Sequence, residues 1–209
     1  MDILDCHTHR TDAEGALISV DPRQFDPQPG LWYSVGFHTW DDVDTLTDDD
    51  FILLEQCARH PQVLAIGETG MDRLRGAGLD VQAAVFIHHL QLAAELDKPV
   101  IVHCVRAAQE ILAARHQAGL TTVPIAIHGL RANEHVARML LDAGCYLSFG
   151  IRFNPDALRS TPLDRLLIET DDTPVTIQEV ADAIAPVLQM SSEQVIKTAA
   201  GNAQRLLIK

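Results

Sequence analysis

Short apolar runs alternate with longer stretches of mixed polarity along most of the chain. Short apolar runs that are bounded by turn residues are typical of buried strands. The alternation therefore predicts repeated strand–helix units, the pattern of an α/β fold with parallel strands. We expect strands near residues 2–6, 16–20, 32–37, 62–67, 99–103, 123–128, 145–149 and 165–169.

The stretches between these runs carry apolar residues at the spacing of one helix face. An early helix should run to Arg59 with Asp48 or Asp49 as its N-cap, because a carboxylate at the N-cap accepts from the free backbone N–H groups of the first turn. The later helices are expected over residues 80–96, 107–118, 132–143, 177–188 and 193–207.

One region departs from this rhythm between His9 and Leu31. It contains Gly15, the Asp21-Pro22 pair and the Pro-rich and Gly-containing segment 26–30. Proline blocks helix propagation, so a short strand fits here but a full helix on either side of it does not. We therefore predict a distorted TIM-type (β/α) barrel with at least one outer helix missing near the N-terminus, formed by a single domain over residues 1–209.

The composition suits a soluble globular enzyme, because 47% of the 209 residues are hydrophobic and 22% are charged. No apolar run is long enough to span a membrane, and the acidic N-terminus lacks the basic segment of a signal peptide. The four cysteines form no CxxC pair, which favours reduced thiols. We expect a cytoplasmic protein with no membrane partner.

The formal net charge of −13 disfavours nonspecific binding of duplex nucleic acid through the general surface, because such binding relies on Lys and Arg meeting phosphates. A local basic site remains compatible with this charge. Bound divalent metal would offset part of the acidity.

Six candidate metal ligands each lie just beyond an apolar run. His7 and His9 follow the first run with one residue between them, and the alternation of side chains along a strand places both on the same face. An α/β barrel carries its chemistry at the carboxyl ends of its strands, so six such side chains predict one metal site there. The other four are Glu68, His103, His128 and Asp171.

Each of these residues also has an ordinary structural interpretation. Glu68 could be a solvated loop acid, and either His103 or His128 could be a hydrogen-bonded core histidine. Asp171 or Asp172 could cap the following helix, although Asp172 could do so and leave Asp171 free.

Several motifs together resemble the TatD family of metal-dependent hydrolases, within the amidohydrolase superfamily. They occur in the family's order across nearly the whole chain. They are Asp5-Cys6-His7-Thr8-His9, Val35-Gly36-Phe37-His38, Ile66-Gly67-Glu68-Thr69-Gly70-Met71-Asp72, Lys98-Pro99-Val100-Ile101-Val102-His103, Ile127-His128-Gly129 and Leu167-Ile168-Glu169-Thr170-Asp171.

The resemblance implies a TIM-type barrel that hydrolyses phosphodiester bonds, often as a deoxyribonuclease, with one or two divalent metal ions. Mixed imidazole and carboxylate ligation suits Zn²⁺ or Mn²⁺, and some family members are used with Mg²⁺. The implied ligands are His7, His9 and Asp171 for one ion, His103 and His128 for the second, and Glu68 as the bridge.

The same resemblance implies a mechanism. The metal pair would lower the pKa of a water molecule and stabilise the attacking and leaving oxygens. Asp171 would orient that water or take its proton, and with Glu68 it makes the catalytic pair. His38 would lie beside the metals and contact the substrate phosphate.

The sequence departs from the family pattern in its loops. It is shorter between His9 and Leu31, and Thr39 stands where the family usually has proline. Gly129-Leu130-Arg131 and Asp172-Thr173-Pro174 also differ from the usual continuations. All six candidate ligands are present, so the departures bear on substrate choice more than on metal binding.

Arginines follow several of the candidate ligands. Guanidinium groups suit phosphate because they donate in a fixed fork, although any one of them could instead pair with an acid such as Asp72, Glu110 or Asp156. We predict a small anionic, phosphate-bearing substrate or a single-stranded DNA end. Its predicted contacts are His38, Arg10, Arg73, Arg106 and Arg131, with Arg152 in a further loop.

Four aromatic residues, Trp32, Tyr33, Phe37 and Trp40, surround His38 in the sequence. They could stack on a base or pack in the core, and core packing is the expectation for Phe37.

Two other functions compete with a nuclease or phosphodiesterase. One is a non-nuclease metal-dependent hydrolase on the same scaffold, acting on an amide, a lactone or a phosphomonoester. The other is a degenerate metal-binding protein without turnover, which the complete ligand set disfavours. The missing helix also predicts a possible homodimer, because a second subunit could cover the exposed flank.

Overall fold

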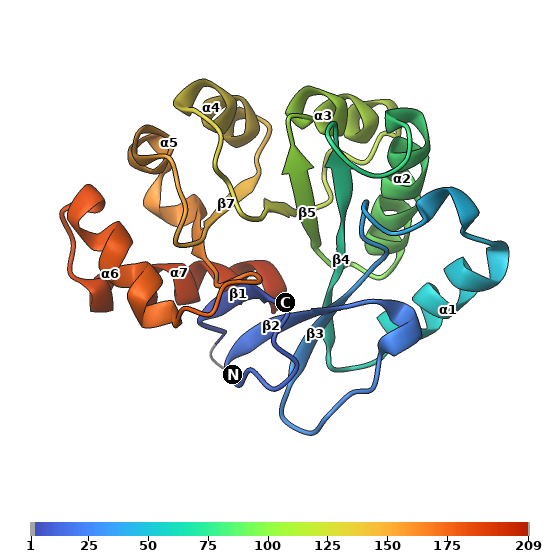
Figure 1. Ribbon diagram of the computed structural model, residues 1–209, viewed down its shortest axis with the longest axis horizontal. Coiled ribbons are helices and arrows are strands. Elements are labelled where there is room, and N and C mark those ends of the chain that lie inside the picture. The colour runs from blue at the N-terminus through green and yellow to red at the C-terminus, as the bar shows by residue number, and fades with distance from the viewer. Residues whose placement is uncertain (1–2, 209) are drawn as a thin grey trace. The chain divides into compact units, whose positions relative to one another are not determined.

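The computed structural model describes residues 3–208, so Asp2 of the expected first strand lies outside the described residues. The strands are ordered in the sheet as they are in the chain, and every described strand pairing is parallel. They are β1 (Asp5–Thr8), β2 (Ala16–Val20), β3 (Trp32–Val35), β4 (Val63–Asp72), β5 (Val100–Val105), β6 (Ile125–Ile127), β7 (Tyr146–Phe149) and β8 (Leu166–Ile168), and Figure 1 labels them except for β6 and β8.

Helices alternate with the strands from β3 onward. They are α1 (Asp48–Ala58), α2 (Leu79–Glu95), α3 (Ala108–Gln117), α4 (Glu134–Asp142), α5 (Pro155–Ser160), α6 (Ile177–Leu188) and α7 (Ser192–Leu207), with short 3₁₀ helices η1 (Pro22–Gln24), η2 (Val43–Thr45) and η3 (Leu163–Arg165). Between β1 and β3, all of which is described, the only helical segment is η1. Eight parallel strands in chain order with interposed helices confirm the TIM-type topology, and the missing early helix is confirmed as well.

Two helix caps differ from the predicted ones. Helix α1 is capped by Thr47, whose hydroxyl accepts from Asp50 N while the Asp50 carboxylate accepts from Thr47 N at 2.8 Å. Asp48 and Asp49 are therefore first-turn residues, because a Thr in a capping box satisfies the free N–H groups one position earlier. Helix α6 is capped by Thr176, so Asp172 is not its cap.

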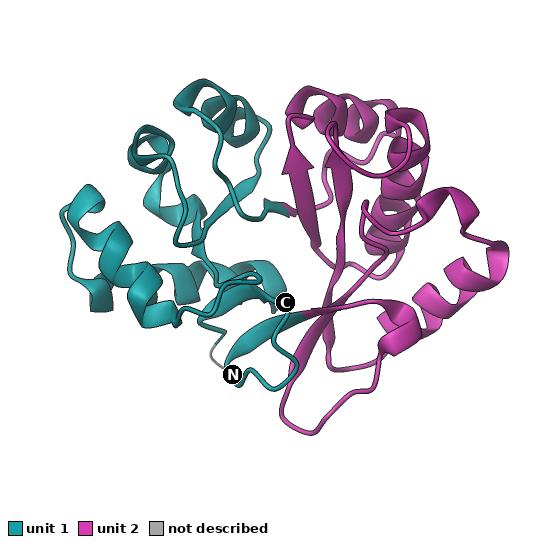
Figure 2. Cartoon of the chain, viewed as in Figure 1, with its two compact units in different colours: residues 1–18, 126–209 teal, residues 19–125 magenta. Residues whose placement is uncertain are grey.

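Figure 2 shows the chain as two compact units, residues 1–18 with 126–209 and residues 19–125. In the first unit, β8 is buried beneath α6 and α7, with Ile168 and Ile184 fully inside. The buried Asn202 amide donates to the Leu163 and Leu166 carbonyls, each at 2.7 Å. These two bonds fix the start of β8 and hence the position of the residues that follow it.

The second unit is built on β4 and β5, which pair from Ile66 with Val100 to Asp72 with Val105 beneath α2. Phe37 and Phe86 are fully buried in this unit, which confirms the core position expected for Phe37. The buried Gln82 of α2 accepts from Asp72 N at 2.7 Å and donates to the Asp72 carbonyl at 3.0 Å. Helix α2 thereby holds the end of β4 in place.

Candidate metal centre

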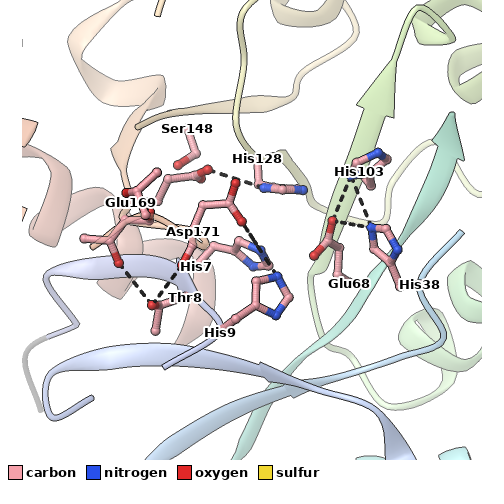
Figure 3. A network of polar contacts seen from close by, with 12 residues as sticks. His7, Thr8, His9, His38, Glu68, His103, His128, Ser148, Glu169 and Asp171 are labelled. Atoms are coloured by element: carbon pink, nitrogen blue, oxygen red, sulfur yellow. Dashed lines mark hydrogen bonds and ion pairs between the residues drawn. The ribbon is translucent and has the colours of Figure 1, made fainter. Parts of the chain in front are cut away.

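The first unit gathers three histidines around the carboxylate of Asp171 (Figure 3). Nε2 of His7 and Nε2 of His9 each lie 3.7 Å from Oδ1 of Asp171, and the rings of His7 and His128 lie 4.1 Å apart. Donor atoms of His7, His128 and Asp171 all fall within 4.8 Å of one another. A separation of 3.7 Å is too long for a hydrogen bond but fits two ligands that each reach one ion at about 2.1 Å.

The backbone of Asp171 is held by the end of β1. Its N–H donates to the His7 carbonyl at 3.0 Å, and its own carbonyl accepts from His9 N and from the Thr8 hydroxyl, each at 3.3 Å. Asp171 has a positive φ of 54°, a conformation that aspartate tolerates better than most side chains. Three hydrogen bonds to β1 therefore fix a conformation that aims the carboxylate at His7 and His9.

A second carboxylate in this unit orients His128. Oε1 of the fully buried Glu169 lies 3.3 Å from Nδ1 of His128, and the other oxygen, Oε2, has no hydrogen-bond partner among the described residues. When Nδ1 carries the proton and donates to Glu169, Nε2 of His128 is left with its lone pair for a metal.

The second unit holds another cluster of imidazole and carboxylate groups (Figure 3). Oε1 of the buried Glu68 lies 2.9 Å from Nδ1 of His103 and 3.0 Å from Nε2 of His38. Nδ1 of His38 accepts from Trp40 N at 3.1 Å, so Nε2 is the protonated nitrogen of neutral His38 and donates to Glu68.

His103 lies between two carboxylates. Its Nε2 is 3.3 Å from Oδ2 of Asp72, and the same oxygen accepts from the Trp40 indole at 2.6 Å. When Nε2 donates to Asp72, Nδ1 presents a lone pair to Glu68 across 2.9 Å. In that tautomer the two acceptors need a cation as their common partner, whereas the other tautomer joins them by a hydrogen bond from Nδ1 to Oε1.

Glycines allow the close strand packing that brings Glu68 and His103 together. A Cβ on Gly70 would lie 2.1 Å from the His103 carbonyl oxygen, and one on Gly67 would lie 2.4 Å from the Ile101 oxygen. Gly70 also has a φ of 144°, which other residues rarely adopt. The register of β4 on β5 shifts between Ile66 and Thr69, so Glu68 lies within a bulge.

Thiols do not complete either cluster, although all four cysteines are free. Burial raises the pKa of the Cys104 thiol to about 11, and burial raises that of Cys6 well above its usual value. Cys6 lies 3.0 Å from the Ser148 hydroxyl and has a structural place in the core. A protonated, buried thiol is a poor nucleophile and a poor ligand, so the donors available are imidazole and carboxylate groups. This donor set suits Zn²⁺, Mn²⁺ or another divalent cation of similar preference.

The predicted ligands do not all lie beyond strand ends. His7 lies within β1, Glu68 within β4 and His103 within β5, whereas His128 follows β6 directly. Asp171 comes three residues after β8, whose last residue is Ile168. The strands that carry these residues extend further than the apolar runs do, because polar residues that pair with a metal or with one another can also be buried in a strand.

The predicted substrate residues are found in different surroundings. Arg73 donates to Glu110 and to the Arg106 carbonyl, and Arg10 contacts the Thr170 hydroxyl at 3.5 Å. Arg106 is exposed with a φ of 51°. Arg131 is exposed and lines a hollow in the first unit.

Two positioning carboxylates, Asp72 and Glu169, were not among the predicted site residues. Both lie inside the motifs that resemble the TatD family, but in the sequence each is only an acidic residue near a predicted ligand. Their roles depend on which ring nitrogen of His103 or His128 they face, and strand register decides this. Trp40 is 44% exposed, so its hydrogen bond to Asp72 holds a solvent-facing ring.

Comparison with known proteins shows consistent matches. The sequence model of the family described as TatD related DNase matches residues 23–208. The uncharacterized metal-dependent hydrolase YcfH of Escherichia coli K12 is 32% identical over 195 residues, which cover 83% of this chain and 72% of YcfH. The 3'-5' ssDNA/RNA exonuclease TatD of Cronobacter turicensis is 35% identical over 153 residues, covering 68% of this chain and 57% of that protein.

Among solved structures, the TatD homologue YjjV from Escherichia coli K12 superposes with a TM-score of 0.77 at 22% identity, covering 92% of this chain and 87% of YjjV. At this identity the likeness shows a shared fold. None of the described helices is both long and apolar enough to cross a membrane.

Proposed function

The chain belongs to the TatD family of metal-dependent hydrolases, and we propose that it cleaves phosphodiester bonds in the manner of a deoxyribonuclease, with a single-stranded DNA end or a small phosphate-bearing molecule as substrate. The observation that carries this proposal is the convergence of His7, His128 and Asp171, whose donor atoms lie within 4.8 Å of one another. A relative 35% identical over 68% of the chain is named a 3'-5' ssDNA/RNA exonuclease, which supports this choice of bond.

We propose as metal ligands the donors of both clusters. One or two divalent ions, Zn²⁺, Mn²⁺ or Mg²⁺, would supply Lewis acidity that activates water for attack on phosphorus. Glu68 would be one of the ligands in the second unit. The proposed set is His7, His9, Glu68, His103, His128 and Asp171.

Asp171 is the proposed proton acceptor. Its backbone is fixed by three hydrogen bonds to the end of β1, so its carboxylate keeps one orientation through the reaction. A base that is already oriented loses little entropy at the transition state, and this raises the rate of proton removal from the attacking water.

His38 is the proposed contact for the substrate phosphate. Its Nε2 proton points to Glu68 at 3.0 Å, and its ring is one-fifth exposed. When Glu68 is engaged as a ligand, the Nε2–H group is available to donate to a phosphate oxygen. This donation would stabilise the negative charge that develops during phosphodiester cleavage.

The proposal can be tested by restoring metal to chelator-treated protein. Bound metal should be counted while hydrolysis of bis(p-nitrophenyl) phosphate and of short single-stranded DNA is followed. Wild type should regain activity as ions bind. Asp171→Asn should lose at least a hundredfold in kcat because it removes the proton acceptor, and Glu68→Ala should bind less metal. Glu193→Ala, on an exposed face of α7, is the matched control and should behave as wild type.

Other outcomes distinguish the competing functions. Restored cleavage of an amide, a lactone or a phosphomonoester, without either phosphodiester, would replace the proposal with a different hydrolase on this scaffold. Metal binding without turnover of any of these substrates would instead indicate a binding protein.

A further inference from the structure

A small hollow opens to solvent in the first unit, beside the candidate catalytic carboxylate. Glu169 and Asp171 line it from the segment after β8, and Arg131 and Arg152 line it from the loops after β6 and β7. The backbones of Gly129 and Gly150 leave room there because they carry no side chain. The hollow therefore combines two guanidinium groups with the acid proposed to take the proton.

Most arginines of this acidic chain are already engaged. Arg23, Arg59 and Arg138, for example, pair with Asp50, with Glu55 and with Glu134. Within residues 3–208, three arginine side chains have no ion pair, hydrogen bond or ring contact with another described residue, and they are Arg106, Arg131 and Arg152. Two of these three line the same hollow.

Unpaired guanidinium groups are unusual in a protein with 29 acidic residues against 16 basic ones. A surface arginine readily finds a carboxylate when one is near, as Arg159 finds Asp156 at a distance of three residues. The guanidinium N–H groups of Arg131 and Arg152 line the hollow without an acceptor from the described residues. A negatively charged ligand would accept charge-assisted hydrogen bonds from them.

We infer that Arg131 and Arg152 form a subsite for a second phosphate group of the substrate, one that is not cleaved. This inference rests on the proposed function and names its substrate class: molecules that carry at least one phosphate besides the reacting one, such as an oligonucleotide. The reacting phosphate belongs at the metal ligands, and the hollow extends from one of them, Asp171, to the two arginines. The neighbouring phosphate of a nucleic-acid strand is the charge that would reach these arginines.

Binding can be tested separately from turnover. Inorganic pyrophosphate should be titrated into chelator-treated, metal-free protein while the arginine Nε–H resonances are followed by NMR. Pyrophosphate should shift two resonances that are missing in Arg131→Lys and Arg152→Lys. Each alanine variant should weaken binding about tenfold, the size of one lost charge-assisted bond. Arg138→Ala removes an exposed arginine of α4 that is paired with Glu134, and this variant should leave the pyrophosphate affinity unchanged.

The kinetics of hydrolysis are the second measurement. Thymidylyl-thymidine, with one phosphate, should be compared with its 5'-phosphorylated and 3'-phosphorylated forms in metal-loaded enzyme. One phosphorylated form should have a KM about tenfold lower. The Arg131→Ala/Arg152→Ala enzyme should lose that difference in KM, and the Arg138→Ala enzyme should keep it.

The results separate two kinds of failure. Unaltered pyrophosphate binding in the double alanine variant would overturn the subsite, whatever the enzyme cleaves. Loss of pyrophosphate binding in that variant, together with no cleavage of any phosphodiester by wild type, would keep the anion subsite and reject the proposed reaction.

Discussion

Oδ2 of Asp72 faces Nε2 of His103 at 3.3 Å and is itself fixed by the Trp40 indole at 2.6 Å. The other oxygen of Asp72 accepts from Leu74 N at 2.7 Å, so the carboxylate cannot rotate without breaking a backbone hydrogen bond. A buried acid held in this way favours the tautomer of His103 that carries its proton on Nε2. Metal affinity of the second unit should therefore depend on a residue that does not itself bind the metal.

Asp72→Asn should lower divalent-metal affinity by about 10-fold to 100-fold. The amide nitrogen that replaces Oδ2 is a donor, so it favours a His103 ring with its proton on Nδ1, the nitrogen required by the metal. Isothermal titration with Zn²⁺ would measure the loss. Asp80→Asn, an exposed acid at the start of α2, is the control. An unchanged affinity in a folded Asp72→Asn protein would contradict the positioning role.

Gly70→Ala should destabilise the second unit by several kcal/mol or prevent its folding, because the new Cβ would lie 2.1 Å from the His103 oxygen at a φ of 144°. Gly201→Ala is the matched comparison, and it should change the stability in the opposite direction. Gly201 lies inside α7 and has open space around it, with the nearest atom, Nη1 of Arg205, at 3.8 Å. The alanine should stabilise α7 by about 1 kcal/mol. Urea unfolding followed by circular dichroism would measure both changes.

The same glycines mark the limit of what the sequence could predict. The pattern of apolar runs places β2 and α6 at their observed bounds, because their ends coincide with turn residues or a cap. Strand β4 was expected to end at Gly67, since glycine commonly marks a turn, yet it continues to Asp72. Close packing on β5 requires glycine there, and no pattern within β4 itself shows that neighbour.

The candidate site could also be predicted only in part from the sequence. The residue types and their order predict imidazole and carboxylate donors, and the structure brings His7, His128 and Asp171 together in one unit. The pairing of Glu169 with His128 depends on backbone register over 41 residues of chain and could not be predicted. Position in the sequence also does not show which arginines are already paired, as Arg73 is with Glu110.

Stability should fall as the pH drops from about 6.5 toward 4, because of His89. Burial lowers its pKa to about 4 from 6.5, and the neutral ring accepts from Phe37 N at 3.0 Å while Nδ1 donates to the Val85 carbonyl. The unfolded chain thus binds a proton in this range that the folded protein excludes, so the contribution is fully present above pH 6.5 and is lost by pH 4. The loss should be on the order of 3 kcal/mol.

His89→Gln should flatten this part of the pH dependence, since glutamine has no proton to gain. The free energy of unfolding would be measured in urea at several values between pH 4 and 7. His116→Gln, on the exposed end of α3, should retain the wild-type slope. Equal slopes for His89→Gln and wild type would show that another group governs acid stability.

Trp40 should report metal binding by its fluorescence. Its ring lies 5.2 Å from that of His103 and 4.8 Å from that of His38, and the chain has only one other tryptophan, Trp32. Trp32→Phe protein should show a saturable change in emission on addition of Zn²⁺, because ligation of His103 changes the charge beside the indole. Trp40→Phe protein should show little change. A response carried by Trp32 would contradict the assignment of His103 as a ligand.

During synthesis on the ribosome, the two clusters can form at different times. His38, Glu68 and His103 lie within a continuous stretch of the second unit, whereas Asp171 must return to the backbone of His7 and His9 at the other end of the chain. A nascent chain can thus assemble the second cluster early but cannot complete the first until β8 has emerged. Metal binding by His7 and Asp171 is then expected only in chains that extend beyond Asp171, whereas shorter translation products could bind metal only through the second cluster.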